Sequence, residues 1–164
     1  MTVKRLFLVL AVAGWLWLPA RAAGVGDAAP AVNLPSLGGG QVQLHALLPN
    51  GPVLLWFTAV TSDDMAQAAA LHQLASQHGA QLVIVPVVGA DQVRAQQIAG
   101  QVPGAIVLLD LDGRVVLSYA GEYIVGVCPN PNLFVVTRTG AIAAARQYPG
   151  IPPSNLSEVL SRSR

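Results

Sequence analysis

The fold of this chain is decided by the stretch Pro52-Val53-Leu54-Leu55-Trp56-Phe57-Thr58-Ala59-Val60-Thr61-Ser62-Asp63-Asp64-Met65. The apolar run Val53–Phe57 does not alternate with polar residues, which predicts a β-strand covered on both faces. Ser62 or Thr61 can then cap a helix whose first turn holds two aspartates, where carboxylates suit the positive end of the helix dipole. The stretch therefore predicts a buried strand that leads directly into a helix.

Strands and helices alternate along the rest of the chain. This order predicts an α/β fold, with a central mixed β-sheet and helices on both of its faces. The expected elements are strands at 32–34, 42–44, 81–88 and 105–110, a helix that follows the cap at Thr61 or Ser62 and ends at Gly79, a helix capped by Asp91 and running to about Ala99, a turn at Asp112-Gly113, a hairpin of 133–136 with 141–145, and a helix over 155–161 capped by Ser154.

The N-terminus carries the pattern of an export signal. A basic pair precedes the apolar run Leu6–Leu18, and Ala20-Arg21-Ala22 then offers small residues two apart, as at a cleavage site. The run is shorter than the roughly 20 residues that a membrane-spanning helix needs. We predict a cleaved signal peptide over residues 1–23, one domain over residues 24–164, and a periplasmic or secreted location, with a retained anchor as the alternative.

The composition of the remaining domain excludes some functions. Residues 24–164 hold six scattered arginines, no lysine and eight acidic residues, so their net charge is near −2. Nucleic-acid binding is disfavoured because no basic face is available. Cys128 is the single cysteine of the chain, so an internal disulfide is impossible and the stability must come from an apolar core.

Four segments of the chain follow one another in a characteristic order, namely Gly26–Leu34, Gly51–Ala59, Leu108–Val115 and Pro131–Ile142. They resemble, in turn, the patterns G-x-x-A-P-x-F-x-L, GKPVLLNFWA, xLLDPDGxV and PTTFLIDRDGKI of the secreted thioredoxin-fold proteins of the TlpA/ResA type, relatives of the AhpC/TSA peroxiredoxins. The resemblance implies a thioredoxin-like fold and, in the family, thiol–disulfide oxidoreductase or peroxiredoxin-like activity.

In that family the junction between the strand and the helix carries a Cys-x-x-Cys pair, and here the two positions read Ser62 and Met65. Thiol–disulfide exchange needs a thiolate and usually a second thiol, which neither a hydroxyl nor a thioether can replace. The resemblance therefore implies a degenerate redox site. Its expected neighbours are Thr61, Asp63, Asp64 and Pro131.

Cys128 is the one remaining reactive group, in a loop expected to face the vacated positions. Two interpretations stay open. It is either a single-thiol site, acting through a mixed disulfide, a peroxide-sensitive thiol or one metal ligand, or a buried and inert cysteine. The resemblance makes Pro131 the family's cis-proline, with Pro129 as a competing candidate.

Other chemistry finds little support in the sequence. Ser62 would need a base to act as a nucleophile, but His72 and His78 lie too far along the same helix and His45 cannot be placed. No C-x-x-C or H-x-x-H spacing exists, so we expect neither a metal nor a bound cofactor.

The stretch 119–130 is longer than the usual connection in the family. Tyr119 and Tyr123, with Glu122 between them, are expected to be exposed on it and to form a surface for a partner.

Three functions follow as hypotheses. The first is an exported, redox-inactive module that binds another envelope protein. The second is a single-cysteine thiol redox or peroxidase-like protein acting through Cys128 with a partner thiol, which leaves enzymatic activity open. The third is a metal- or cofactor-handling accessory of the envelope. Contact with a membrane is expected only if the N-terminal segment is retained.

Overall fold

A computed structural model describes residues 21–163, so the predicted signal peptide lies almost wholly outside the described residues. The described chain alternates strands and helices, as the sequence predicts. The elements are β1 (Asn33–Pro35), β2 (Gln41–Gln43), α1 (Leu44–Leu47), a 3-10 turn (Leu48–Asn50), β3 (Val53–Thr58), α2 (Ser62–Gln77), β4 (Gln81–Pro86), α3 (Gln92–Gln101), β5 (Ile106–Val107), α4 (Arg114–Ala120), β6 (Leu133–Val136), β7 (Ile142–Arg146) and α5 (Pro153–Arg162).

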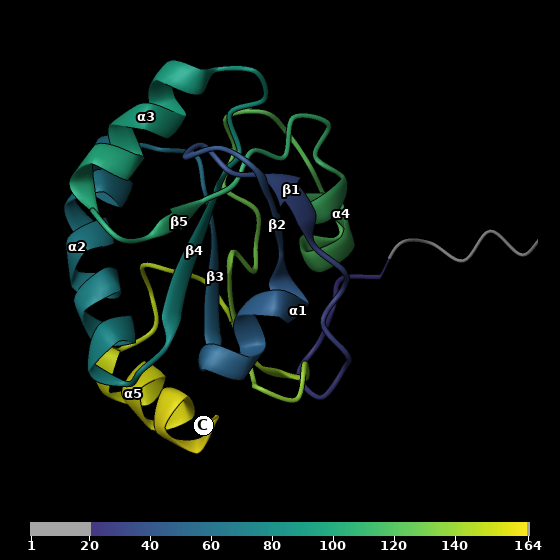
Figure 1. Cartoon of the computed structure of the whole chain (residues 1–164), viewed down its shortest axis with the longest axis vertical. Coiled ribbons are helices and arrows are strands. Elements are labelled where there is room, and N and C mark those ends of the chain that lie inside the picture. Colours follow the sequence, from purple (N-terminus) through teal and green to yellow (C-terminus); the bar gives the residue numbers. More distant parts are fainter. Residues whose placement is uncertain (1–20, 164) are drawn as a thin grey trace, which may run out of the picture.

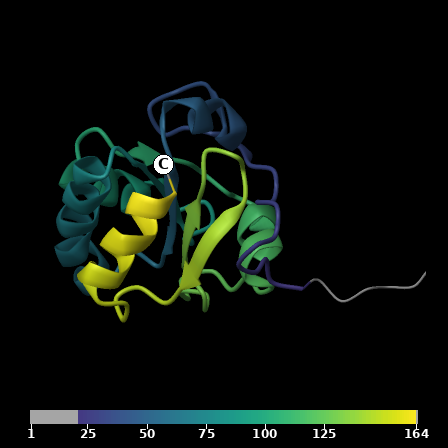
Figure 2. The same ribbon diagram turned by 90° about the horizontal axis from the view of Figure 1, so that it is seen from below.

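A five-stranded mixed sheet in the order β5-β4-β3-β6-β7 forms the centre of the molecule. β3 pairs parallel with β4 and antiparallel with β6, and β4 pairs parallel with β5. Helices α2, α3 and α5 cover one face, and α4 with the β1–β2 hairpin covers the other (Figures 1 and 2). The predicted α/β class, with helices on both faces of a mixed sheet, is confirmed.

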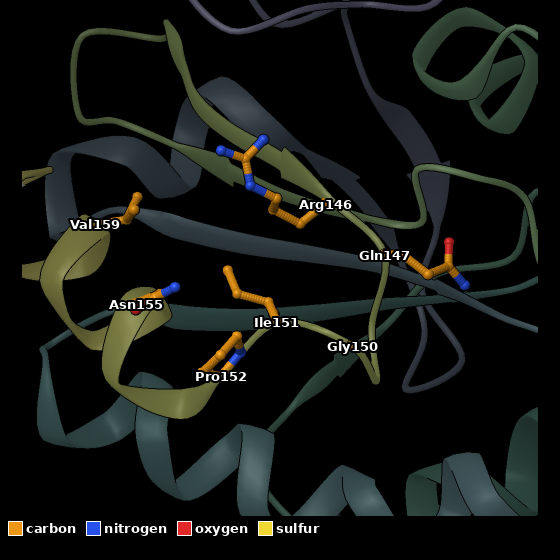
Figure 3. Close-up of a pocket in the computed structure, with 7 residues that line it drawn as sticks. All are labelled: Arg146, Gln147, Gly150, Ile151, Pro152, Asn155 and Val159. Atoms are coloured by element: carbon orange, nitrogen blue, oxygen red, sulfur yellow. The ribbon is translucent and has the colours of Figure 1, made fainter.

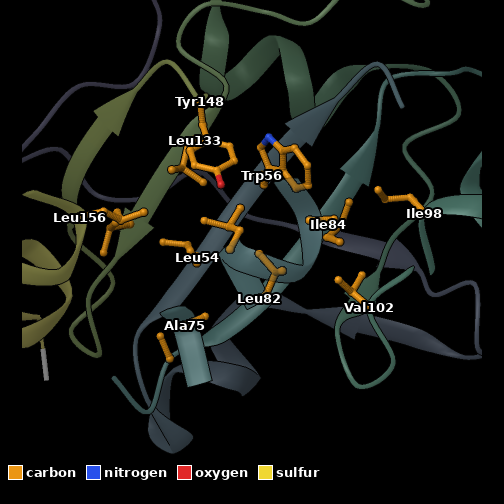
Figure 4. Close-up of a cluster of buried hydrophobic side chains, with 14 of the residues drawn as sticks. Leu54, Trp56, Ala75, Leu82, Ile84, Ile98, Val102, Leu133, Tyr148 and Leu156 are labelled. Atoms are coloured by element: carbon orange, nitrogen blue, oxygen red, sulfur yellow. The ribbon is translucent and has the colours of Figure 1, made fainter. Parts of the chain in front are cut away.

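The side chains of β3 alternate between two apolar cores, one on each face of the sheet. Leu54 and Trp56 belong to the core under α2, α3 and α5, where the Trp56 ring meets Tyr148 edge-on at 5.7 Å between centroids (Figure 4). Leu55 and Phe57 belong to the core under α4. The four β3 side chains are fully buried, and each contributes roughly 1.5–3 kcal/mol of hydrophobic free energy.

Helix α4 was not expected from the sequence. Val115 and Val116 are β-branched, which lowers the helix propensity of this segment, yet they lie in a seven-residue helix. The carboxylate of Asp110 accepts a hydrogen bond from the N–H of Val116 at 2.8 Å and so satisfies a donor in the first turn. Gly113 opens the helix with a φ of 70°, a conformation that glycine adopts without strain.

The cap of α2 is Thr61 rather than Ser62. The Thr61 hydroxyl accepts the N–H of Asp64 at 3.2 Å, and the Asp64 carboxylate accepts the N–H of Thr61 at 3.0 Å, which is a reciprocal capping box. Ser62 is the first helical residue and is exposed. The N-cap residue of a helix has a non-helical main chain, and here that residue is Thr61, so Thr61 and not Ser62 caps the helix.

Several expected element limits also differ. The predicted strand 105–110 is hydrogen-bonded as a regular strand only over Ile106–Val107. Helix α5 begins at Pro153, which suits the first helical turn, and Ser154 makes no cap. The buried stripe of α2 runs through Asp64, Ala68, Leu71 and Ala75, and Met65 and Leu74 pack against the same core while partly buried.

Asp110 is 3% exposed and one of its two carboxylate oxygens, Oδ1, has no hydrogen-bond partner within residues 21–163. Burial raises the pKa of this carboxyl above its ordinary value of 3.8, against the lowering effect of the Val116 N–H, and the charge of Asp112 raises the pKa further. The charged form of Asp110 is therefore disfavoured in the folded protein.

The capping box predicts an asymmetric effect of two neighbouring substitutions. Thr61→Ala removes the oxygen that accepts the Asp64 N–H and should lower the free energy of unfolding by about 1 kcal/mol. Ser62→Ala is the matched control and should leave it unchanged, because the Ser62 side chain makes no hydrogen bond with any residue from 21 to 163. Chemical denaturation of both variants measures the difference, and equal losses would contradict this placement of the cap.

Asp110→Asn should gain stability relative to the native protein as the pH rises. Because the folded pKa is raised, the unfolded carboxyl ionises first, and the native protein loses stability as the pH climbs through the ordinary value of 3.8 toward the raised one. Asparagine keeps an acceptor for Val116 and carries no charge. Denaturation at acidic and at neutral pH should show that the free energy of unfolding of the variant, relative to the native protein, is higher at neutral pH. A difference that does not change with pH would contradict a raised pKa of Asp110 as the cause.

Candidate functional site

The candidate site lies where the parallel strands β3 and β4 end and the long loop 121–131 crosses them. The N–H of Gly126 donates to the carbonyl of Val87, just past β4, at 2.7 Å. The N–H of Phe57 in β3 donates to the carbonyl of Asn132 at 2.8 Å, which fixes the end of the loop against the central strand. These two contacts bring the loop that carries Cys128 over the junction between β3 and α2.

Cys128 is partly buried and its thiol is held by the main chain and by one buried amide. The Asn132 Nδ2–H donates to Cys128 Sγ at 2.9 Å, and the thiol lies 3.6 Å from the carbonyl oxygen of Phe57. Asn132 is fully buried and also exchanges hydrogen bonds with the main chain of Tyr148, at 2.7 and 2.8 Å. The thiol therefore has a defined orientation.

The surroundings of the thiol oppose ionisation. Burial raises the pKa of Cys128 above its ordinary value of 9.0, and the nearby carboxylate of Asp64 raises it further. The Asn132 amide and the N–H of Ala59 act in the opposite direction, because they donate to the thiolate. Burial is the largest cause, so the thiol is not activated as redox-active cysteines at helix N-termini are.

The predicted site residues are partly brought together. Thr61 and Asp64 are joined in the capping box, and Asp64 is close enough to Cys128 to act on its pKa. Ser62 and Asp63 are exposed on the first turn of α2, while Met65 packs against the core. Within residues 21–163 no hydrogen bond joins Ser62 to Cys128.

The turn from β3 into α2 carries backbone strain. Val60 has a φ of 56°, and within residues 21–163 no other residue except glycine has a positive φ. A β-branched residue in this region costs roughly 1–3 kcal/mol and persists only when its surroundings hold it. The Val60 side chain is buried and its N–H donates to Thr58 Oγ1 at 2.9 Å, which holds the turn.

Pro131 follows a cis peptide bond, as the resemblance implied, and the bond before Pro129 is not among the cis bonds of the described chain. A second cis bond, Tyr148–Pro149, was not predicted. Sequence reasoning also missed Asn132, whose buried amide joins the Cys128 loop to Tyr148. The only signal was a polar residue at the entry to an apolar strand.

The prediction that Tyr119 and Tyr123 are exposed is wrong for Tyr119. Tyr119 is fully buried on α4, its hydroxyl donates to the carbonyl of Pro30 at 2.9 Å, and burial raises its pKa. Tyr123 is half-buried because its ring lies over Gly113. Glu122 is exposed and accepts the N–H of Asn130 at 3.3 Å. The exposed large side chains of this loop are instead Ile124, Val125 and Val127.

The three histidines lie away from the candidate site. His45, on α1, approaches the β6–β7 turn, at the opposite end of the sheet from Cys128. His72 lies near Gly104, and His78 meets the hydroxyls of Ser157 and Ser161 on α5. None of the three histidines is placed to activate Ser62.

Within residues 21–163, no three His, Cys, Asp or Glu side chains converge so that they could hold a metal ion. A surface pocket of about 400 Å³ opens between the end of β7 and α5, as Figure 3 shows, and none of the predicted site residues lines it. No helix in the described part of the chain is long and apolar enough to cross a membrane.

Solved structures of similar fold are found among bacterial redox proteins. The chain is similar to a peroxidoxin, BcpB, from Mycobacterium tuberculosis (TM-score 0.68, 20% identity, 87% of this chain and 99% of that chain). It is also similar to a putative thiol:disulfide interchange protein DsbE from Chlorobium tepidum (0.62, 22%, 87% and 96%) and to a secreted disulfide oxidoreductase from M. tuberculosis (0.61, 20%, 80% and 95%). No family model and no curated protein sequence matches the chain.

These likenesses establish a thioredoxin-like fold, similar to that of the peroxiredoxin and DsbE-type redoxins. The chain departs from dithiol chemistry in one decisive respect, since its single cysteine excludes a Cys-x-x-Cys pair. It is a thioredoxin-fold protein with one thiol, and that thiol comes from the loop opposite the N-terminus of α2.

The pKa of Cys128 predicts slow alkylation at neutral pH. The rate of reaction with iodoacetamide should rise only at a pH above the ordinary pKa of a cysteine thiol, because burial and the charge of Asp64 disfavour the thiolate. Asp64→Asn should lower the apparent pKa while keeping an acceptor for the Thr61 N–H. Asp63→Asn, an exposed neighbour on the same turn, is the control. An apparent pKa below the ordinary value would instead indicate an activated thiol.

Proposed function

We propose that the protein is an exported, redox-inactive thioredoxin-fold module that binds another envelope protein through the candidate site. The observation that carries this proposal is the N-terminus of α2. There the structure has the Thr61–Asp64 capping box and an exposed Ser62, and the sequence resemblance implies that this turn is where related enzymes hold a reactive cysteine pair. A site without a second thiol has no internal route to complete thiol–disulfide exchange.

The retained features of the site support a binding role. The strained turn at Val60, the capped helix and the Cys128 loop form a defined surface at the ends of β3 and β4. Export is supported by the signal pattern over residues 1–23 and by the similar fold of a protein described as secreted.

A second candidate function is a single-cysteine redox protein that uses a partner thiol. The orientation of Cys128 favours it, because the Asn132 amide donates to Sγ and would stabilise a thiolate once formed. The raised pKa weighs against it. The third hypothesis, a metal- or cofactor-handling accessory, gains no support from the side chains that the structure describes.

The binding proposal is tested by co-purification with the tagged protein from envelope extracts, followed by reconstitution with the identified partner. Binding should survive Cys128→Ser, since no covalent bond is required. Ser62→Arg should weaken it at least tenfold, about 1.4 kcal/mol, because a bulky charge then occupies the candidate site. Gln73→Arg, exposed further along the same helix, is the matched control for the added charge.

Two outcomes would contradict the proposal. The partner could be recovered only as a covalent adduct that a reducing agent releases, and not at all with Cys128→Ser. This outcome would assign the function to the Cys128 thiol. Equal affinity of Ser62→Arg and Gln73→Arg for the reconstituted partner would place the binding surface elsewhere.

A further inference from the structure

An uncharged apolar tip projects from the loop that follows α4. Its side chains, Ile124, Val125 and Val127, are 58%, 58% and 49% exposed, although side chains of this kind are usually buried. No charged residue occurs from Tyr123 to Pro131. Contiguous exposed apolar side chains on a folded domain indicate a contact with another apolar phase.

The tip is held in place rather than left as a free loop. The N–H of Val127 donates to the carbonyl of Ile124 at 3.0 Å and closes a turn, and the N–H of Gly126 is bonded to Val87. A Cβ placed on Gly89 would lie 3.5 Å from the Val125 side chain, so the base of the tip packs closely against the end of β4. The apolar side chains are thus presented to solvent by a supported turn.

The place where the N-terminal segment joins the domain indicates what the tip contacts. The N–H of Ala23 donates to the carbonyl of Tyr119 at 2.9 Å, and a Cβ on Gly121 would lie 3.2 Å from the Ala22 nitrogen. The chain therefore reaches the domain at the C-terminal end of α4, where the loop with the tip begins. The apolar run Leu6–Leu18 lies only a few residues before this point.

We propose that the apolar tip rests in the surface of a lipid bilayer when the N-terminal segment is attached. The apolar run is too short to span a bilayer but long enough to bind its interface. One weak apolar anchor gives only marginal binding, and two together give stable attachment. The segment and the tip supply two contacts from one end of α4. The proposal does not depend on the partner-binding function.

The test uses the full chain with Cys128→Ser and one new cysteine, Val125→Cys, labelled with an environment-sensitive fluorophore and reconstituted in vesicles of phosphatidylethanolamine and phosphatidylglycerol. The emission should shift to the blue, and lipids that carry a doxyl quencher should quench it. Val127→Cys should behave in the same way. Val93→Cys, on α3 and 63% exposed, is the control and should show neither effect.

Three results would overturn the proposal. Labels at 125 and 93 that respond alike would show that the tip stays in water. A blue shift at 125 without quenching by doxyl lipid would show that protein covers the tip, either a partner or the segment Leu6–Leu18 itself. A blue shift of equal size before vesicles are added would assign the cover to the chain's own segment or to a second copy.

Discussion

The two-sided burial of β3 is the constraint on which the rest of the structure depends. Every residue of Val53–Thr58 is buried, so neither face of the strand can meet water and each face requires its own layer of cover. Helices α2, α3 and α5 supply one layer, and α4 with the N-terminal hairpin supplies the other. The site then follows from the strand direction, because β3 and β4 are parallel and their ends meet at one edge of the sheet.

A small set of buried polar contacts positions the residues of the candidate site on this sheet. Asn132 is fully buried and satisfies its amide against Tyr148 and Cys128, which fixes the loop of the thiol relative to the β7–α5 connection. Thr61 and Asp64 close the first turn of α2 by reciprocal hydrogen bonds. Buried polar groups are costly unless paired, so these contacts hold their partners in one arrangement. The result is a rigid surface that carries a single thiol with a raised pKa.

The fold class could be read from the sequence because the decisive signals are local. The unbroken apolar run of β3 and the punctuation by glycine and proline mark strands and helices within short windows. Helix α4 could not be predicted in this way because Val115 and Val116 favour strands. The carboxylate of Asp110 and burial against the sheet stabilise the helix. The burial of Tyr119 could not be predicted either, because a tyrosine in a long connection looks exposed until its ring is packed between Phe57 and Phe134.

The sequence alone determined that this is an α/β chain with a central two-sided strand, and that dithiol chemistry is impossible with one cysteine. Both conclusions depend only on composition and local pattern. The tertiary structure decided what surrounds that cysteine. The Cys128 thiol lies against the carbonyl of Phe57, 71 residues earlier, and near the carboxylate of Asp64, and its burial in these surroundings raises its pKa. Electrostatic and hydrogen-bonding environments are made by residues distant in the chain, and only the packing of the sheet brings them together.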